Sequence, residues 1–360
     1  MNAIDLNAVT KSFPAFELGP IDLGIRKGEL LGIFGPPSSG KTSVLKIILG
    51  LLQQDGGEVA LAGVSGSELG VSERGLSMVF QNLALFPHLS GAENITFPLR
   101  EAGTDATRIA ERLEAVSRVL HVEHILHKKP GQMSGGERQR IALGRALAAE
   151  SGAVLLDEPI SALDARLREE MRLELKRLQR EQGQTFVYVS HDEEEVMAIA
   201  DRIAILIDGK IAQLGTPDEV YNTPATSAVA ALVGSPPMNL IPGRVAEDGR
   251  SFQSDALKDP IALPRQVRAG PVTLGVRPKT STSRRARRTP LPFASSRSNR
   301  WAATASSTLP LRVSRCAFAP HVTSPRATIS PRPCVSTSRA CTSSIRTATA
   351  SDPCRIGDIP

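Results

Sequence analysis

One short stretch near the start of the chain joins an apolar run to a helix, and it limits the possible folds more than any other feature. Leu30–Phe34 (LLGIF) is continuously apolar and ends at a turn rich in glycine and proline, GPPSSGKT. Lys41–Leu52 (KTSVLKIILGLL) then has the length and apolar spacing of a helix. Similar apolar runs recur at Ala153–Leu156, Phe186–Val189 and Ile203–Ile207, the last followed by an Asp-Gly turn. Helical patterns separate these runs, so the chain is predicted to be an α/β protein.

The turn itself fits a phosphate-binding pattern. Gly35–Thr42 matches G-x-x-x-x-G-K-[ST], and it stands between a predicted strand and a predicted helix, as the binding mechanism requires. Backbone N–H groups of the loop and of the helix N-terminus would face the phosphates. Lys41 would reach the terminal phosphates, and the Thr42 hydroxyl would coordinate Mg²⁺. The predicted nucleotide-binding residues of this loop are Gly35, Pro36, Pro37, Ser38, Ser39, Gly40, Lys41, Thr42 and Ser43.

A second apolar run, Ala153–Leu156, ends in two adjacent carboxylates, Asp157 and Glu158. Asp157 is predicted to hold Mg²⁺, and Glu158 is predicted to polarise the attacking water. Adjacent acidic residues at the solvated end of a strand are common, but a phosphate loop upstream favours the catalytic interpretation.

A third motif points to a family. Met133–Arg140 (MSGGERQR) resembles the LSGGQxQR string of ATP-binding-cassette (ABC) ATPases. Two glycines and a serine at a helix N-terminus make a second phosphate-binding surface. The resemblance implies that Ser134, Gly135 and Gly136 close over the ATP held by a second cassette. Active sites would then form only in a head-to-tail pair of cassettes.

Further strings match this family in its usual order. Gln81 resembles the Q-loop glutamine, which would contact Mg²⁺ and the attacking water. Ala84–His88 resembles the segment that touches the membrane subunit. Asp164 resembles the D-loop aspartate at the nucleotide site, and His191 the switch histidine that contacts the γ-phosphate. Phe13 is similar to the aromatic residue that stacks on adenine.

The resemblance is to one subgroup, the sugar-importer ATPases of the maltose/glycerol-3-phosphate type. The strings SHDEEEVMAIADRI, VGSPPMNLIPGRV and TLGVRP are similar to that subgroup. The resemblance implies that ATP hydrolysis drives uptake of a sugar or a glycerol-phosphate-like solute. Implied partners are a second cassette, two transmembrane permease subunits and a periplasmic or lipid-anchored solute-binding protein; nucleic acid is not expected. The implied location is the cytoplasmic face of the bacterial inner membrane, and no apolar run approaches the roughly 20 residues that a membrane span needs.

Three regions are expected. Residues 1–234 would form an ABC ATPase domain with a helical insertion at about 83–150. Residues 235–278 would begin a β-rich, oligosaccharide-binding-like domain. Residues 279–360 would form a disordered tail.

The phosphate loop departs from the family pattern G-P-S-G-x-G-K-[ST] at Pro37 and Ser38. Proline contributes no N–H, and a serine is disfavoured if its position needs a positive φ. Loss of one donor costs on the order of 1 kcal/mol. Weakened rather than abolished ATP binding is therefore expected.

The last 82 residues have a different composition from the rest. They contain Lys279 and thirteen Arg against two Asp, so 14 − 2 = +12, and the first 278 residues carry 6 − 12 = −6. All four Cys and the only Trp also lie there. Three interpretations are open: a basic arm that binds RNA or membrane phosphates, a dispensable low-complexity extension, or the family's C-terminal domain translated in a shifted frame.

A shifted frame after Pro278 is favoured. Codons chosen for Ser343–Ser351 and read one base earlier give LFDPDSDRI, which is similar to a string near the end of the family. Codons for Ser298–Leu309 in the same frame give VEPLGGDRFVYL, which is similar to another of its strands. Two functions would compete with an active importer subunit: a decayed, inactive cassette from a frameshifted gene, or a soluble ABC ATPase with a nucleic-acid-binding basic tail.

Overall fold

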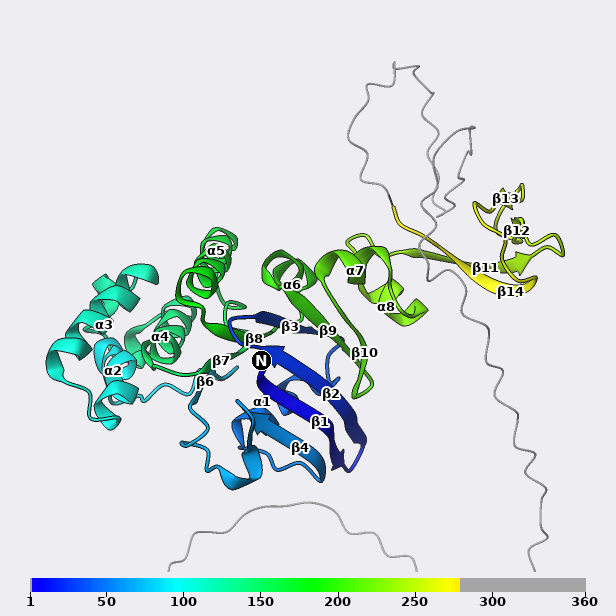
Figure 1. The fold of residues 1–360 in the computed structure, drawn as a ribbon. Coiled ribbons are helices and arrows are strands. Elements are labelled where there is room, and N and C mark those ends of the chain that lie inside the picture. Colours follow the sequence, from blue (N-terminus) through cyan, green and yellow to red (C-terminus); the bar gives the residue numbers. More distant parts are fainter. Residues whose placement is uncertain (1, 279–360) are drawn as a thin grey trace, which may run out of the picture. The chain divides into compact units, whose positions relative to one another are not determined.

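The computed structural model describes residues 2–278 of the 360-residue chain (Figure 1). The predictions for residues 279–360, namely a shifted frame, disorder and a basic arm, lie outside the described residues. The described part is an α/β protein with a central sheet, a second sheet packed against it, a group of helices and a third small sheet.

A six-stranded sheet in the order β10-β9-β3-β8-β7-β6 forms the centre. Its strands are β3 (Leu30–Phe34), β6 (Leu76–Val79), β7 (Ala153–Asp157), β8 (Thr185–Val189), β9 (Arg202–Ile207) and β10 (Lys210–Gly215). Neighbours pair in parallel, except for the hairpin of β9 and β10. Every residue of β3, β7 and β8 is buried, as expected for parallel strands covered on both faces. The strands predicted from the apolar runs are confirmed.

One face of this sheet packs on a helix and on an antiparallel sheet. Leu31 and Ile33 of β3 belong to the same buried cluster as the apolar side of α1 (Lys41–Leu49). The second sheet, in the order β2-β1-β4-β5, completes this cluster. Its strands are β1 (Asn2–Phe13), β2 (Phe16–Arg26), β4 (Gly56–Leu61) and β5 (Val64–Ser65).

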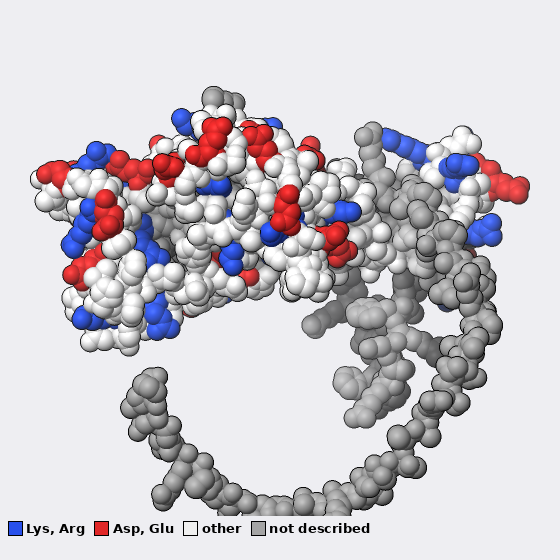
Figure 2. Space-filling model, turned by 90° about the horizontal axis from the view of Figure 1, so that it is seen from below, with Lys and Arg blue, Asp and Glu red and all other residues white. Residues whose placement is uncertain are grey.

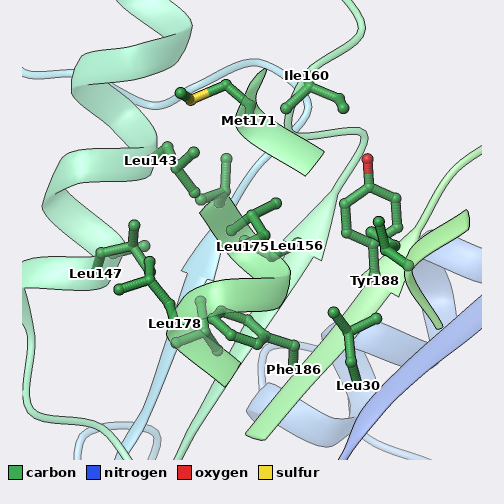
Figure 3. Packing of buried hydrophobic residues seen from close by; sticks show 14 of the residues in the cluster. Leu30, Leu143, Leu147, Leu156, Ile160, Met171, Leu175, Leu178, Phe186 and Tyr188 are labelled. Carbon is green, nitrogen blue, oxygen red and sulfur yellow. The ribbon is translucent and has the colours of Figure 1, made fainter. Parts of the chain in front are cut away.

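The other face of the central sheet is covered by helices. Leu30, Leu156 and Phe186 point to this side and pack with leucines of α4 and α5, as Figure 3 shows. The helices between α1 and β9 are α2 (Gly91–Glu101), α3 (Ala106–Val119), α4 (Gly135–Ala148), α5 (Ala165–Gln182) and α6 (Glu193–Ile199). Three of them, α2, α3 and α4, lie together beyond the β6 edge of the sheet, within the range predicted for a helical insertion (Figure 1).

The first helix is shorter than its sequence pattern suggests. A helix was expected over 41–52, but α1 ends at Leu49. Gly50 adopts the left-handed conformation with φ of 85°, and its N–H donates to the carbonyls of Ile47 and Lys46. This is a glycine cap, which satisfies terminal carbonyls and turns the chain out of the helix.

A third sheet follows two short helices, α7 (Pro217–Asn222) and α8 (Ser227–Leu232). Its order is β13-β12-β11-β14, and Phe252 is fully buried in its small core. The strands are β11 (Asn239–Val245), β12 (Ser251–Gln253), β13 (Ile261–Ala262) and β14 (Gly270–Val276). Three short 3₁₀ turns complete the described chain, η1 (Gly66–Glu68), η2 (Glu123–Ile125) and η3 (Pro130–Gln132).

The surface carries charges of both signs. On the face drawn in Figure 2, acidic and basic side chains are interspersed, so the described residues show no broad field of one sign there. Among residues 2–278, no helix is both long and apolar enough to cross a membrane.

Candidate active site

The phosphate loop leaves the carboxyl end of β3, in the middle of the central sheet. Its two glycines are required for different reasons, a close backbone contact at Gly35 and a positive φ at Gly40. A Cβ on Gly35 would lie 2.0 Å from the carbonyl oxygen of Leu206, which no side chain could tolerate. Gly40 has φ of 100° and forms the N-cap of α1. The loop can therefore curl tightly between the strand and the helix.

Lys41 lies inside this curl. Its Nζ donates hydrogen bonds to the carbonyl oxygens of Gly35 at 2.9 Å and Pro36 at 2.8 Å. Burial lowers the pKa of Lys41, and the nearby carboxylates of Glu158 and Asp157 oppose that shift. An ammonium group with little water around it is a strong partner for phosphate oxygens.

Ser38 and Pro37, the two residues that depart from the family pattern, affect the loop in different ways. Ser38 has φ of 62°, so the condition under which a serine is disfavoured is met. Pro37 lines the same cleft as Lys41 and lacks an N–H that could point at a phosphate. The loop thus combines a strained residue with a missing donor.

Asp157 ends β7 next to the start of α1. The Thr42 hydroxyl donates to its two carboxylate oxygens at 2.9 and 3.2 Å. Burial raises the pKa of Asp157, and the hydrogen bond from Thr42 opposes this. A hydroxyl and a carboxylate are the hard oxygen ligands that Mg²⁺ prefers, so these two residues fit the predicted metal site.

Glu158 is held in an unusual conformation directly after β7. Its φ is 51°, and its backbone N–H donates to the Val189 carbonyl at 2.9 Å. The carboxylate Oε1 is 2.8 Å from Nδ1 of His191, whose side chain is 60% exposed. Glu158 and His191 thus form a hydrogen-bonded pair at the ends of two neighbouring strands.

A buried network fixes the residues just before His191. Glu195 is buried, and its Oε2 accepts hydrogen bonds from the Tyr188 hydroxyl at 3.0 Å and the Ser190 hydroxyl at 2.7 Å. Burial raises the pKa of Tyr188 well above its ordinary value, with the Glu195 carboxylate adding to the shift. Sequence reasoning did not identify this support, because no motif marks it.

The phosphate loop, the Asp157 and Glu158 carboxylates and His191 line one cleft of about 770 Å³. Most of the predicted site residues meet in it: Phe13, Pro37, Ser38, Gly40, Lys41, Thr42, Ser43, Gln81, Asp157, Glu158 and His191. Gly35, Pro36 and Ser39 form the back of the loop and do not line the cleft. The cleft therefore brings together the phosphate loop, three metal-ligand candidates (Thr42, Gln81 and Asp157) and the candidate base Glu158.

An aromatic pair forms one wall of the cleft. Phe13 and Phe16 are direct partners at the tip of the β1–β2 hairpin, with ring centroids 6.0 Å apart. A Cβ on Gly40 would lie 3.1 Å from a ring carbon of Phe16, so this ring packs on the phosphate loop. Phe13 was predicted to stack on adenine; Phe16 was not assigned, although the short spacing between the two residues was a usable signal.

The predicted signature residues lie apart from this cleft. Ser134 caps α4 by accepting a hydrogen bond from the Glu137 N–H, and Gly135 and Gly136 form the first turn of the helix. The Asp164 carboxylate caps α5 and accepts from the Leu167 N–H. None of these residues lines the cleft. For Ser134, Gly135 and Gly136 this is expected if they belong to the site of a second cassette. Asp164 was predicted at the nucleotide site, and it too lies outside this cleft.

One residue connects the two regions, and sequence reasoning missed it. Gln139, on α4, donates from Nε2 to the Glu158 carbonyl at 2.9 Å, and its Oε1 accepts from the Ala162 N–H at 2.9 Å. Gln139 stands in the motif MSGGERQR, but its target could be recognised only in three dimensions.

The chain is similar to known proteins over most of its described residues. The ABC transporter family matches residues 18–161, and the MalK OB fold domain matches residues 234–279. The sn-glycerol-3-phosphate import ATP-binding proteins UgpC of Yersinia enterocolitica and Paraburkholderia xenovorans are each 41% identical to the chain, over 283 and 288 residues. These alignments cover 78% of this chain and 78% and 80% of the relatives. UgpC 1 of Rhizobium johnstonii is 44% identical over 262 residues, 71% of this chain and 70% of the relative.

A solved structure is also similar. The dimeric ATP-binding cassette MJ0796, in a post-hydrolysis state with ADP and phosphate bound, is 31% identical with a TM-score of 0.55. The match covers 59% of this chain and 98% of that cassette.

Proposed function

The chain belongs to the ABC transporter family, and from that premise we propose that it powers the import of a sugar or a glycerol-phosphate-like solute into a bacterial cell. It binds ATP with Mg²⁺ and hydrolyses ATP, as cassettes of this family do. The observation that carries the proposal is the cleft that joins Lys41, Asp157 and the Glu158–His191 pair. The names of the UgpC relatives support the class of solute.

The proposed roles follow from the geometry of the cleft. Lys41 and the loop N–H groups bind the phosphates. Thr42, Asp157 and Gln81 would hold Mg²⁺, which neutralises charge on the phosphate oxygens. Glu158 accepts a proton from the attacking water, and His191 keeps that carboxylate oriented through the 2.8 Å contact. Phe13 stacks on the adenine ring.

The proposed assembly follows from the separation of the two phosphate-binding surfaces. Ser134, Gly135 and Gly136 would complete the site of a second cassette in a two-fold pair. Transmembrane permease subunits and a solute-binding protein would supply the path and the choice of solute. The pair would lie on the cytoplasmic face of the inner membrane, attached through the permeases.

We further propose that the described residues belong to two domains. Residues 1–234, with the helical insertion at about 83–150, would be the ATPase domain, and residues 235–278 would begin the β-rich domain. The third sheet, β11 to β14, and its separate buried core support the second limit.

Replacing Pro37 by serine should strengthen ATP binding about fivefold. The replacement restores an N–H donor worth on the order of 1 kcal/mol, which corresponds to that factor. Titration with a fluorescent ATP analogue measures the dissociation constant. Ser38→Gly is the matched control. Because Ser38 is already left-handed in the described loop, that change should raise the melting temperature and leave the dissociation constant within twofold. An unchanged dissociation constant for Pro37→Ser would contradict the role of the missing donor.

Uptake in the native host tests the proposed function. Deletion of the gene should abolish uptake of radiolabelled sn-glycerol-3-phosphate or of a labelled sugar, and the intact gene should restore it. The Glu158→Gln gene should not. ATP hydrolysis by the purified chain together with unchanged uptake of every tested solute would refute the importer assignment while leaving the ATPase assignment in place.

A further inference from the structure

Two consecutive residues beyond Gln81 have a backbone conformation that side chains disfavour. Leu83 has φ of 63° and Ala84 has φ of 44°. Both are left-handed, and neither is glycine, so their Cβ atoms crowd the following carbonyl. A pair of such residues persists only where the surrounding structure holds it.

Arg145 of α4 holds this pair. Its guanidinium donates from Nη1 to the Ala84 carbonyl at 2.7 Å and from Nη2 to the Leu83 carbonyl at 3.0 Å. The same group lies over the ring of Phe86, with its carbon 5.6 Å from the ring centroid. The Arg145 side chain therefore contacts both left-handed residues, Leu83 and Ala84, and also Phe86.

The far end of the segment is held by α2. Asn94 is fully buried, and its Oδ1 accepts from the Phe86 N–H at 2.9 Å. Its Nδ2 donates to the carbonyls of Phe86 and Leu89 at 3.2 Å and of Ser90 at 3.0 Å. Between these attachments, Pro87 and His88 are exposed. The segment is thus fixed at both ends, and its middle is exposed.

We propose that Arg145 is a positioning residue that acts through this strained pair. It links Gln81 in the cleft, the exposed segment Ala84–His88 and the signature surface at Ser134. By holding Leu83 and Ala84 left-handed, it fixes Gln81 in the cleft relative to Ala84–His88, the segment predicted to touch the permease. Arg145 lies on α4, the helix that Ser134 caps and that Gly135 and Gly136 begin. A shift of α4 therefore moves these signature residues and Arg145 together. The inference rests on the proposed function.

Hydrogen exchange of the full chain tests the grip directly. Arg145→Ala should speed exchange of the backbone amides of residues 82–86 at least tenfold, with the amides of β7 and β8 unchanged. Arg112→Ala is the matched control, since Arg112 also donates to two adjacent carbonyls, those of Leu147 and Ala148. That change should leave residues 82–86 at the original rate. Equal exchange of residues 82–86 in both variants and the unaltered chain would overturn the proposal.

ATPase kinetics test the functional consequence. Arg145→Ala should lower kcat at least fivefold with KM for ATP within threefold, because Gln81 acts on the attacking water more than on ATP binding. Arg112→Ala should keep kcat within twofold. Adding Ala84→Gly to Arg145→Ala should recover at least twofold in kcat, since glycine adopts the left-handed conformation without Cβ crowding. Arg145→Lys retains one donor group, so its kcat should lie between those of Arg145→Ala and the unaltered chain.

Two kinetic results would overturn the proposal: a kcat for Arg145→Ala equal to that of Arg112→Ala, or no recovery with Ala84→Gly. Failure of the proposed function is distinguishable. Absence of ATPase activity in the unaltered chain would remove the proposed function, whereas the exchange experiment would still decide whether Arg145 holds the strained pair.

Discussion

Glu158→Gln should lower kcat for ATP hydrolysis at least a hundredfold while leaving the ATP dissociation constant within threefold. In the unaltered chain, Glu158 Oε1 lies 2.8 Å from His191 Nδ1. Glutamine has the size of glutamate and can keep a polar contact with that nitrogen. It cannot accept a proton from water, and a positioned general base contributes roughly 10²–10⁴-fold. ATP binding depends on the loop and on Lys41, which the substitution does not alter.

Phosphate release and a fluorescent nucleotide titration measure the two quantities. Glu150→Gln is the control, because Glu150 is an exposed glutamate whose partner is Arg108, away from the cleft. It should behave as the unaltered chain does. Hydrolysis by Glu158→Gln at more than a tenth of the normal rate would show that another group activates the water.

Lys41→Ala should weaken ATP binding at least tenfold. A hydrogen bond to a charged group is worth about 1.5–3 kcal/mol, and the Lys41 ammonium lies in a loop where burial has already lowered its pKa. The change also removes the Lys41 hydrogen bonds to the carbonyls of Gly35 and Pro36. The turn itself depends on Gly35 and Gly40, so the fold should survive this loss.

Isothermal titration with ATP measures the loss. Lys46→Ala, on the exposed side of the same helix, is the matched control and should change the dissociation constant less than threefold. A melting temperature for Lys41→Ala within a few degrees of normal would confirm that the fold is retained. An unchanged dissociation constant would mean that the loop N–H groups alone bind the phosphates.

Much of the central fold was predictable from the sequence because its signals are local. β3, β7 and β8 are short apolar runs, and parallel strands buried on both faces need no alternation. The phosphate loop is also local, since the strand, the glycines and the helix are contiguous. The carboxyl ends of the parallel strands then brought Lys41, Asp157 and His191 to one edge, as the motifs implied.

The antiparallel sheet was not assigned, and β1 shows why. Its pairing with β2 shifts register between Leu6 and Val9, and Ala8 between them has φ of 48°. This irregularity interrupts the two-residue alternation by which a half-buried strand is recognised.

The residues that support the site were missed for another reason. Gln139, Glu195 and Arg145 act on carbonyls, hydroxyls or neighbouring segments that are distant in sequence or carry no motif.

The pairing of β7 with β8 has a kinetic consequence. Asp157 is opposite Val189 in the sheet, and the Glu158 N–H donates to that same Val189. Neighbouring strands are held at a fixed spacing, so the distance between base and histidine is a property of the single chain. If a second chain supplies the signature surface, pairing of the two chains adds only that surface, because the Glu158–His191 pair is already formed within one chain. Turnover at saturating ATP should then be limited by encounter of two chains, and the specific activity should rise with protein concentration until pairing is complete.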